Sequence, residues 1–216
     1  DESMREGIQI ERADVPTADK IRLIDALNET GVKHIIVTSF VSPRWTPSMA
    51  DADEVAAGFH AKPGITYTAL IPNQRGMERA QQFAPKITVE REGVSLGCTG
   101  SDVFERRNFN RKRDEQIAQW PSIVQRAKER GVKEAGIGGT SSMGSNFEGD
   151  IPEWVRMYWF EQEYNLWKEA GVKVTSVGLT DTQGWADPTQ YAHQVTTIKN
   201  KWPEVTNINL HLHNAR

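Results

Sequence analysis

Two histidines, His211 and His213, stand two residues apart near the end of this 216-residue chain. They lie in a segment, residues 207–214, where polar and apolar side chains alternate as they do in a strand with one face toward a core. The apolar side chains of this segment are expected to pack against helices: Ile208, Leu210 and Leu212. The two imidazoles share the opposite face and could bind one metal ion, although such pairs also occur on surfaces and in cores without a ligand.

Charged side chains in two other places could complete a metal site. Glu6 follows Arg5 near the start of the chain, and Asp181 follows an apolar run that ends at Leu179. Two imidazoles and one carboxylate hold a divalent cation and leave open positions for a substrate. Such a cation polarises a carbonyl or hydroxyl oxygen as a Lewis acid, and Arg5 could stabilise an oxyanion beside it. Taken alone, Arg5 and Glu6 are better explained as an exposed ion pair.

The periodicity of apolar residues predicts helices that alternate with strands. Helices are predicted over residues 17–30, 53–59, 76–83, 111–130, 150–171 and 188–202. Strands are predicted over residues 34–38, 65–71, 132–137, 172–179 and 207–214, with a further strand inside 87–96 and the end of another within 1–11. Asp150 and Asp187 are predicted to cap the last two helices, Asp150 in a capping box with Glu153.

A recurrent glycine indicates how these elements are joined. Gly31, Gly131 and Gly171 each follow a predicted helix and precede a valine that opens the next element. Helices and strands that alternate in this way form a parallel sheet with helices outside. The polar face of the histidine strand favours a closed barrel, whose functional side chains lie at the carboxyl ends of its strands. The alternative is a doubly wound open sheet, but the glycine-rich phosphate turn typical of that fold is not found.

We therefore expect an α/β protein, a (β/α)8 TIM barrel, with one catalytic domain over residues 1–216. A full barrel takes about 250 residues. We accordingly expect the barrel to be incomplete at both ends, with its eighth strand, a further metal ligand and the loop of a catalytic cysteine beyond Arg216.

The composition is that of an ordinary globular protein. It is 38% hydrophobic and 25% charged, and the net charge of −3 argues against nucleic acid or a membrane surface as a partner. The single cysteine, Cys98, excludes an internal disulfide and favours a reducing compartment. No apolar run approaches the ~20 residues of a membrane span, and we expect a cytoplasmic protein.

Segments along the chain resemble, in the same order, motifs of the hydroxymethylglutaryl-CoA lyase-like family of metal-dependent lyases and Claisen-condensing enzymes built on a TIM barrel. The segments are Arg5-Glu6-Gly7-Ile8-Gln9, Thr38-Ser39-Phe40-Val41-Ser42-Pro43-Arg44-Trp45, Met49-Ala50-Asp51, Thr180-Asp181-Thr182-Gln183-Gly184 and His211-Leu212-His213. Each alone is a weak signal, but together they span nearly the whole chain.

The resemblance implies retro-Claisen cleavage of a 3-hydroxy-3-methylglutaryl-CoA-like acyl-CoA to acetyl-CoA and a 3-oxo acid. It implies a divalent metal, Mg or Mn in preference to Zn, held by Glu6, His211 and His213. Arg5 would stabilise the enolate, and either Asp181 or His211 would be the base. The implied substrate pocket is lined by Gln9, Ser39, Ser101, Asn110, Ser142 and Thr182. A homo-oligomer is compatible with this class of protein.

Several positions depart from the family pattern. Ile36 stands where the lyases carry an active-site glutamate, Glu6 where they usually carry aspartate, and Asn214 where they carry aspartate. Cys98 does not match their catalytic cysteine and is expected to be a buried packing residue. Two other functions therefore stay open: a Claisen-condensing synthase or aldolase on the same barrel, and a catalytically silent relative that binds acyl-CoA.

Overall fold

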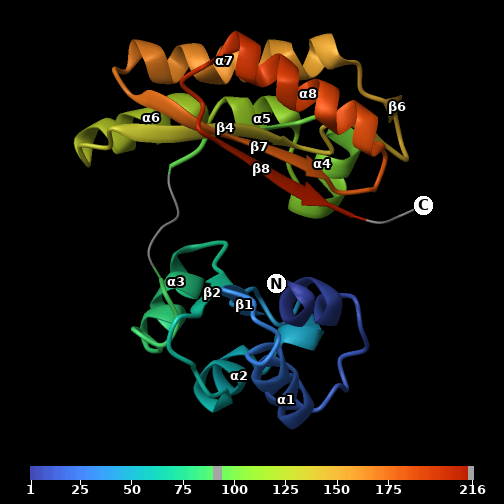
Figure 1. Ribbon diagram of the computed structural model, residues 1–216, viewed down its shortest axis with the longest axis vertical. Coiled ribbons are helices and arrows are strands. Elements are labelled where there is room, and N and C mark those ends of the chain that lie inside the picture. The colour runs from blue at the N-terminus through green and yellow to red at the C-terminus, as the bar shows by residue number, and fades with distance from the viewer. Residues whose placement is uncertain (90–93, 214–216) are drawn as a thin grey trace. The chain divides into compact units, whose positions relative to one another are not determined.

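The structure is a computed structural model that describes residues 1–89 and 94–213. It divides into two compact units, Asp1–Arg91 and Glu92–Arg216 (Figure 1). Residues 90–93, inside the strand expected over 87–96, and Asn214 lie outside the described residues. Among those described, no helix is long and apolar enough to cross a membrane.

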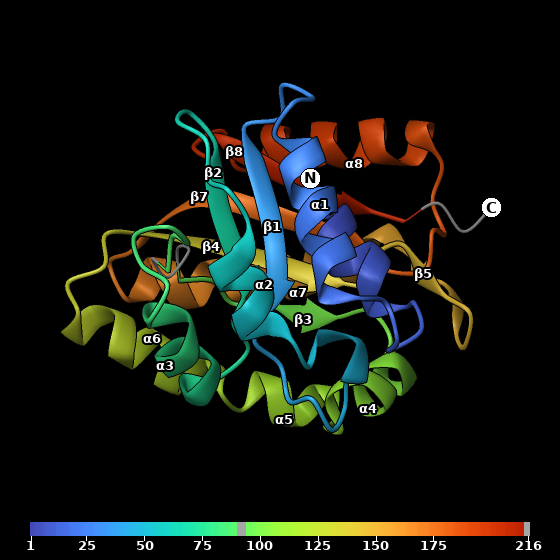
Figure 2. The same ribbon diagram turned by 90° about the horizontal axis from the view of Figure 1, so that it is seen from below.

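The first unit contains one pair of parallel strands with helices packed against it. Its elements are η1 (Ser3–Gly7), α1 (Thr17–Leu27), β1 (His34–Ser39), η2 (Pro47–Met49), α2 (Ala52–Gly58), β2 (Thr66–Leu70) and α3 (Gln74–Gln81). The strands β1 and β2 run side by side with His34 opposite Thr66 (Figure 2). Ile35 and Val37 of β1 point into a core shared with Ile24 of α1, as expected for a strand with one face toward a helical layer.

The start of the chain is only partly as expected. The Asp1 amino group donates to the carbonyl of His34 at 2.6 Å, and the Ile36 amide donates to the carbonyl of Asp1 at 2.9 Å. This is the bonding pattern of a residue in a parallel ladder opposite Ile35. The prediction of a strand end that carries Arg5 and Glu6 is wrong, because both lie in the π-helical turn η1.

The second unit contains a four-stranded parallel sheet in the order β3-β4-β7-β8. Its elements are β3 (Cys98–Thr99), α4 (Asp102–Phe109), α5 (Arg113–Ile117), α6 (Trp120–Glu129), β4 (Glu134–Thr140), β5 (Gly144–Ser145), β6 (Gly149–Asp150), α7 (Glu153–Glu169), β7 (Lys173–Asp181), α8 (Pro188–Lys201) and β8 (Asn207–Leu212). Helices α7 and α8 lie over one face of the sheet (Figure 1). The core between them contains Trp167, Val177 and Ile198.

Two local predictions in the second unit are corrected by the structure, and one helix was missed. The helix expected over 111–130 is two helices, and α6 begins at Trp120 with Pro121 in its first turn, where a proline without an N–H is tolerated. Helix α4 was not predicted. Asp150 does not cap α7, because Pro152 is the N-cap and the Asp150 carboxylate accepts from the Trp185 indole instead.

The other boundary signals were predicted correctly. Asp187 caps α8 in a capping box with Gln190. Gly31, Gly131 and Gly171 have φ of 85°, 69° and 73°, the left-handed conformation that ends a helix and that glycine adopts without steric cost.

Candidate active site

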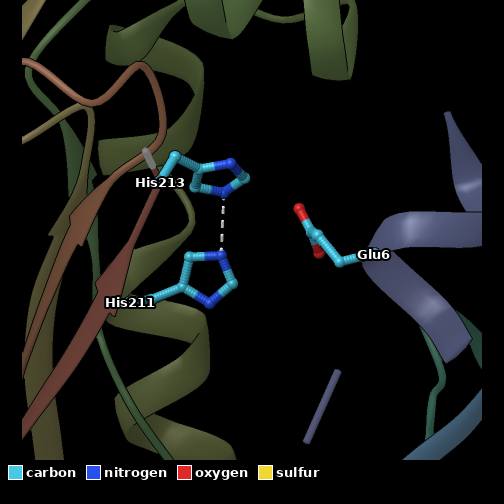
Figure 3. Close-up of side chains that lie close together, drawn as sticks. All are labelled: Glu6, His211 and His213. Atoms are coloured by element: carbon cyan, nitrogen blue, oxygen red, sulfur yellow. Dashed lines mark hydrogen bonds between the residues drawn. The ribbon is translucent and has the colours of Figure 1, made fainter. Parts of the chain in front are cut away.

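The carboxyl end of β8 brings two imidazoles together. His211 Nε2 and His213 Nε2 are 3.0 Å apart, and the ring centroids are 5.0 Å apart. Figure 3 shows both rings extending from the same side of the strand. Only one hydrogen fits between the two Nε2 atoms. If both imidazoles are neutral, one Nε2 donates this hydrogen and the other Nε2 accepts it with its lone pair. The alternation predicted from the sequence is thus confirmed for the histidines.

The opposite face of β8 is less buried than predicted. Ile208 packs against the core of the second unit. Leu210 and Leu212, however, are 45% and 53% exposed. The prediction that the apolar face packs against helices is therefore confirmed for Ile208 and wrong for the two leucines in the structure described.

Asp181 lies on the other face of the sheet from His211. In the parallel pairing of β7 with β8, Thr180 is opposite His211 and Asp181 is opposite Leu212, and paired residues point to the same face. The Asp181 side chain is 2% exposed, and its Oδ2 accepts from the Ala186 amide at 2.9 Å. Burial, and then the charge of Asp181, raise the pKa of Tyr191 on α8. The carboxylate thus closes the turn after β7 and faces the helical layer.

The predicted pocket residues after β4 and β7 are joined to each other. The Ser141 amide donates to Thr182 Oγ1 at 3.0 Å, and the Ser142 amide donates to the carbonyl of Thr180 at 3.0 Å. The Ser142 hydroxyl donates to the carbonyl of Gly139 at 2.6 Å. Ser142 and Thr182 therefore lie at one end of the sheet, in loops linked by hydrogen bonds.

Ser101 and Asn110 stand at the two ends of α4. Ser101 is fully buried and caps the helix, its Oγ accepting from the Phe104 amide at 3.0 Å. The same Oγ donates to Glu148 at 2.5 Å. Asn110 ends the helix in the left-handed conformation, with φ of 51°, and is exposed. Glu148 was not predicted from the sequence, because an acidic residue in a loop carries no periodic signal.

The first unit places Arg5 between two carboxylates. Its guanidinium pairs with Glu2 and with Glu6, and the Arg5 side chain is only 14% exposed. Figure 3 shows Glu6 extending from η1. The ion pair that was the alternative explanation for Arg5 and Glu6 is therefore present, but half-buried, and a guanidinium can contact two carboxylates while a third ligand approaches its remaining N–H groups.

The other first-unit residues of the predicted site flank the long loop after β1. Ser39 is fully buried at the end of β1. Gln9 is exposed, and its carbonyl accepts from the Ser48 hydroxyl at 3.1 Å. The loop is anchored by a contact that the sequence did not reveal: Lys20, 2% exposed, donates to Asp51 at 2.6 Å and to the carbonyl of Ser48 at 2.7 Å.

Two departures from the family pattern now have a structural setting. Ile35 and Val37 point into the core of the first unit, so Ile36 between them points to the opposite face of β1, next to Thr68. Cys98 is 5% exposed, and burial raises the pKa of its thiol to about 12. A buried neutral thiol of this kind is a packing residue, as predicted.

Residues 1–216 match the HMGL-like family, and the chain belongs to that family. The family is built on the TIM barrel, so the predicted fold class is confirmed.

Individual relatives agree with this assignment. The chain is 34% identical over 186 residues to the 3-hydroxy-3-isohexenylglutaryl-CoA/hydroxy-methylglutaryl-CoA lyase of Pseudomonas aeruginosa, a match that covers 86% of this chain and 58% of that protein. It is 33% identical over 217 residues to the mitochondrial hydroxymethylglutaryl-CoA lyase of Mus musculus, covering 98% of this chain and 61% of that protein. The structure matches the HMG-CoA lyase of Acinetobacter baumannii in complex with coenzyme A and 3-methylmalate, with a TM-score of 0.71 and 29% identity, over 100% of this chain and 66% of that one. The chain thus spans 58% and 61% of the length of the two curated relatives.

Proposed function

We propose that this chain provides most of the barrel of a carbon–carbon lyase that cleaves a 3-hydroxy-3-methylglutaryl-CoA-like acyl-CoA by retro-Claisen chemistry. The observation that carries the proposal is the pair of imidazoles at the carboxyl end of β8, with nitrogens 3.0 Å apart, in a chain that belongs to the HMGL-like family. Carboxyl ends of barrel strands are where such enzymes place their reacting groups.

The donor chemistry fits a divalent metal. Two imidazole nitrogens directed at one gap, with Glu6 as the carboxylate ligand, form a mixed nitrogen and oxygen set without thiolate. Such a set accommodates Mg²⁺ or Mn²⁺, and it also accommodates Zn²⁺, which two histidines and one glutamate hold in zinc enzymes. When bound, the cation supplies Lewis acidity to the oxygens of the substrate.

The residues of the chain would supply the proton transfer and the charge stabilisation. Of the two candidates for the base, His211 lies on the polar face of the sheet, whereas Asp181 faces the helical layer. One ring nitrogen has one lone pair, so it serves a proton or a cation but not both at once. His211 is therefore the proposed base for the 3-hydroxyl proton only when it does not hold the cation, and Asp181 is the other candidate.

Loss of that proton lets the C2–C3 bond break. The hydroxyl carbon becomes the carbonyl of the 3-oxo acid, and the electron pair passes to the enolate of acetyl-CoA. Arg5 would stabilise the negative charge on the enolate oxygen, and uptake of one proton at carbon then gives acetyl-CoA. Gln9, Ser39, Asn110, Ser142 and Thr182 are the proposed lining of the pocket.

Ile36 supports a substrate with a larger substituent than methyl. An isoleucine on the face of β1 opposite to the core makes that wall apolar, where the family carries a glutamate. The Pseudomonas aeruginosa relative is named for an isohexenyl substrate as well as for the methyl one. Ile36 is also the one feature that favours a catalytically silent acyl-CoA-binding relative, while the Claisen-condensing alternative would use the same metal ligands.

A combined metal and cleavage assay tests the proposal. The purified protein with its whole barrel, loaded with Mn²⁺ or Mg²⁺, is expected to retain about one equivalent of metal and to release acetyl-CoA from 3-hydroxy-3-methylglutaryl-CoA or an analogue with a longer 3-alkyl group. Metal binding without release of acetyl-CoA from any of them would favour a silent relative. Consumption of acetyl-CoA in the presence of a 2-oxo acid would favour a synthase.

A further inference from the structure

A short hairpin, β5–β6 with its turn, follows β4 over residues 144–150. At its turn, Glu148 reaches the N-terminus of α4. Glu148 Oε2 accepts from the Ser101 hydroxyl at 2.5 Å and from the Ser145 hydroxyl at 2.5 Å. Its Oε1 accepts from the Val103 amide at 3.2 Å. One carboxylate therefore satisfies donors from two loops that are far apart in the sequence.

The surroundings of this carboxylate favour its ionised form. Burial opposes ionisation, yet the hydrogen bonds from Ser101, Ser145 and Val103 hold the pKa of Glu148 below its ordinary value. Hydrogen bonds to an ionised acceptor are roughly twice as strong as neutral ones, and the N-terminus of a helix favours a negative charge.

The other side of the hairpin is joined to the loop after β7. The Asn146 amide donates to Gln183 Oε1 at 2.6 Å, and the Trp185 indole donates to Asp150. The loops at the carboxyl ends of β3, β4 and β7 are thus connected through this one hairpin.

The bonding of Ser101 limits what its side chain can do. A serine hydroxyl has one proton. Ser101 gives it to Glu148, while its oxygen accepts from the Phe104 amide at 3.0 Å. In this arrangement the Ser101 hydroxyl has no proton left for a substrate oxygen.

We propose that Glu148 is a positioning residue that holds the hairpin against α4, and that Ser101 acts on the substrate pocket through Glu148 and not by touching the substrate. The effect on substrate rests on the function proposed above. The contact fixes the loop that carries Ser142 and, through the hairpin, the loop that carries Thr182. Small displacements of positioning groups lower kcat/KM by up to ~10²-fold.

The experiment compares Glu148→Gln, Ser101→Ala, the double variant and the matched control Glu115→Gln. Glu115 also accepts from a backbone amide at the start of a helix, because its carboxylate bonds the Lys112 amide at 2.7 Å. It is exposed, and this bond does not involve the hairpin. In Glu148→Gln, the amides of residues 103–104 and 146–148 are expected to exchange with deuterium on the order of 10-fold faster, and the control is expected to leave them unchanged.

Kinetics separate positioning from general destabilisation. Glu148→Gln is expected to raise KM for the acyl-CoA on the order of 10-fold with kcat changed much less, as for a loss of binding that ground state and transition state share. Ser101→Ala is expected to add little in the Glu148→Gln background, because residues that act through one contact are not additive.

Several outcomes would overturn the proposal: unchanged exchange at residues 146–148 in Glu148→Gln, the same losses in Glu115→Gln, or additive effects of Ser101→Ala and Glu148→Gln on kcat/KM. Additive effects would return Ser101 to direct contact with substrate. If the native chain cleaves no acyl-CoA, the proposed function fails, and the exchange comparison then decides alone whether Glu148 holds the hairpin.

Discussion

The loops after β3, β4 and β7 differ from the end of β8 in how their polar groups are bonded. In the loops, Ser101, Ser142 and Thr182 exchange hydrogen bonds with neighbouring loops and backbone. At the end of β8, the Nε2 atoms of His211 and His213 lie 3.0 Å apart and bond to each other. Polar residues near strand ends thus differ: those in the loops bond to neighbouring loops, and the two histidines bond to each other and are the proposed metal ligands.

Removing a proposed ligand should have the largest effect. His213→Ala is expected to abolish metal retention and to lower kcat/KM by ~10³-fold or more, since a Lewis acid supplies several kcal/mol of transition-state stabilisation. His193→Ala is the matched control, because His193 is an exposed imidazole paired with Glu153 at 2.9 Å. Metal analysis and steady-state kinetics measure both variants. Full metal content in His213→Ala would place the cation elsewhere.

Arg5→Lys tests the group assigned to the developing negative charge. The guanidinium contacts Glu2 and Glu6 at once, and a lysine ammonium cannot reproduce this fork. We expect an intact fold and a ~10²–10³-fold loss in kcat, measured beside circular dichroism and metal content. Turnover close to that of the native chain would exclude Arg5 from the reaction.

Part of this fold and of the candidate site could be predicted from the sequence. Alternation in β8 identified the shared face of His211 and His213, because the period of a strand is set by covalent geometry. The sequence could not separate Asp150 from Asp187 as helix caps. Both precede a helix, but α7 begins at Glu153 with Pro152 as its N-cap, and the Asp150 carboxylate accepts from Trp185 instead.

Asp181 shows a second limit of the sequence. Its motif predicted a catalytic carboxylate, but the register of β7 against β8 turns its side chain toward α8. Register depends on pairing partners that are distant in the chain. Glu148 was missed for a related reason, since its partners lie 47 and 45 residues away.

Ile36→Glu tests whether Ile36 determines the substrate preference. Ile36 points to the face of β1 opposite to the core and stands where the family carries a carboxylate. One apolar contact changes preference by ~1–3 kcal/mol, or roughly 10–200-fold. We expect the native chain to prefer 3-hydroxy-acyl-CoAs with a longer substituent, and the variant to shift toward the methyl substrate. The measurement is kcat/KM for both substrates in both proteins. Efficient cleavage of the methyl substrate by the native chain, unchanged in the variant, would refute the role of Ile36.

The smallest effect is expected for Glu163, a buried residue that joins α7 to β4 inside the second unit. It is fully buried on α7, and its Oε2 accepts from the Gly138 amide of β4 at 2.8 Å. Burial raises the pKa of Glu163 well above its ordinary value. The pKa of Glu163 is therefore higher in the folded chain than in the unfolded chain. Its protonated carboxyl contributes its full stabilisation of the fold below the unfolded pKa of ~4.3. Stability is then lost as the pH rises through the folded pKa.

Glu163→Gln should remove this pH dependence. The amide has the shape of the protonated carboxyl and can still accept from Gly138, but it does not titrate. Urea unfolding between pH 5 and pH 8 should show the native chain losing up to about 1.4 kcal/mol per pH unit relative to the variant. Glu161→Gln, on the same helix but half-exposed beside Lys201, should follow the native chain. Parallel stability curves for native and Glu163→Gln protein would mean that Glu163 keeps the same pKa when the chain unfolds, and that the Gly138 contact stabilises β4 equally with either protonation state.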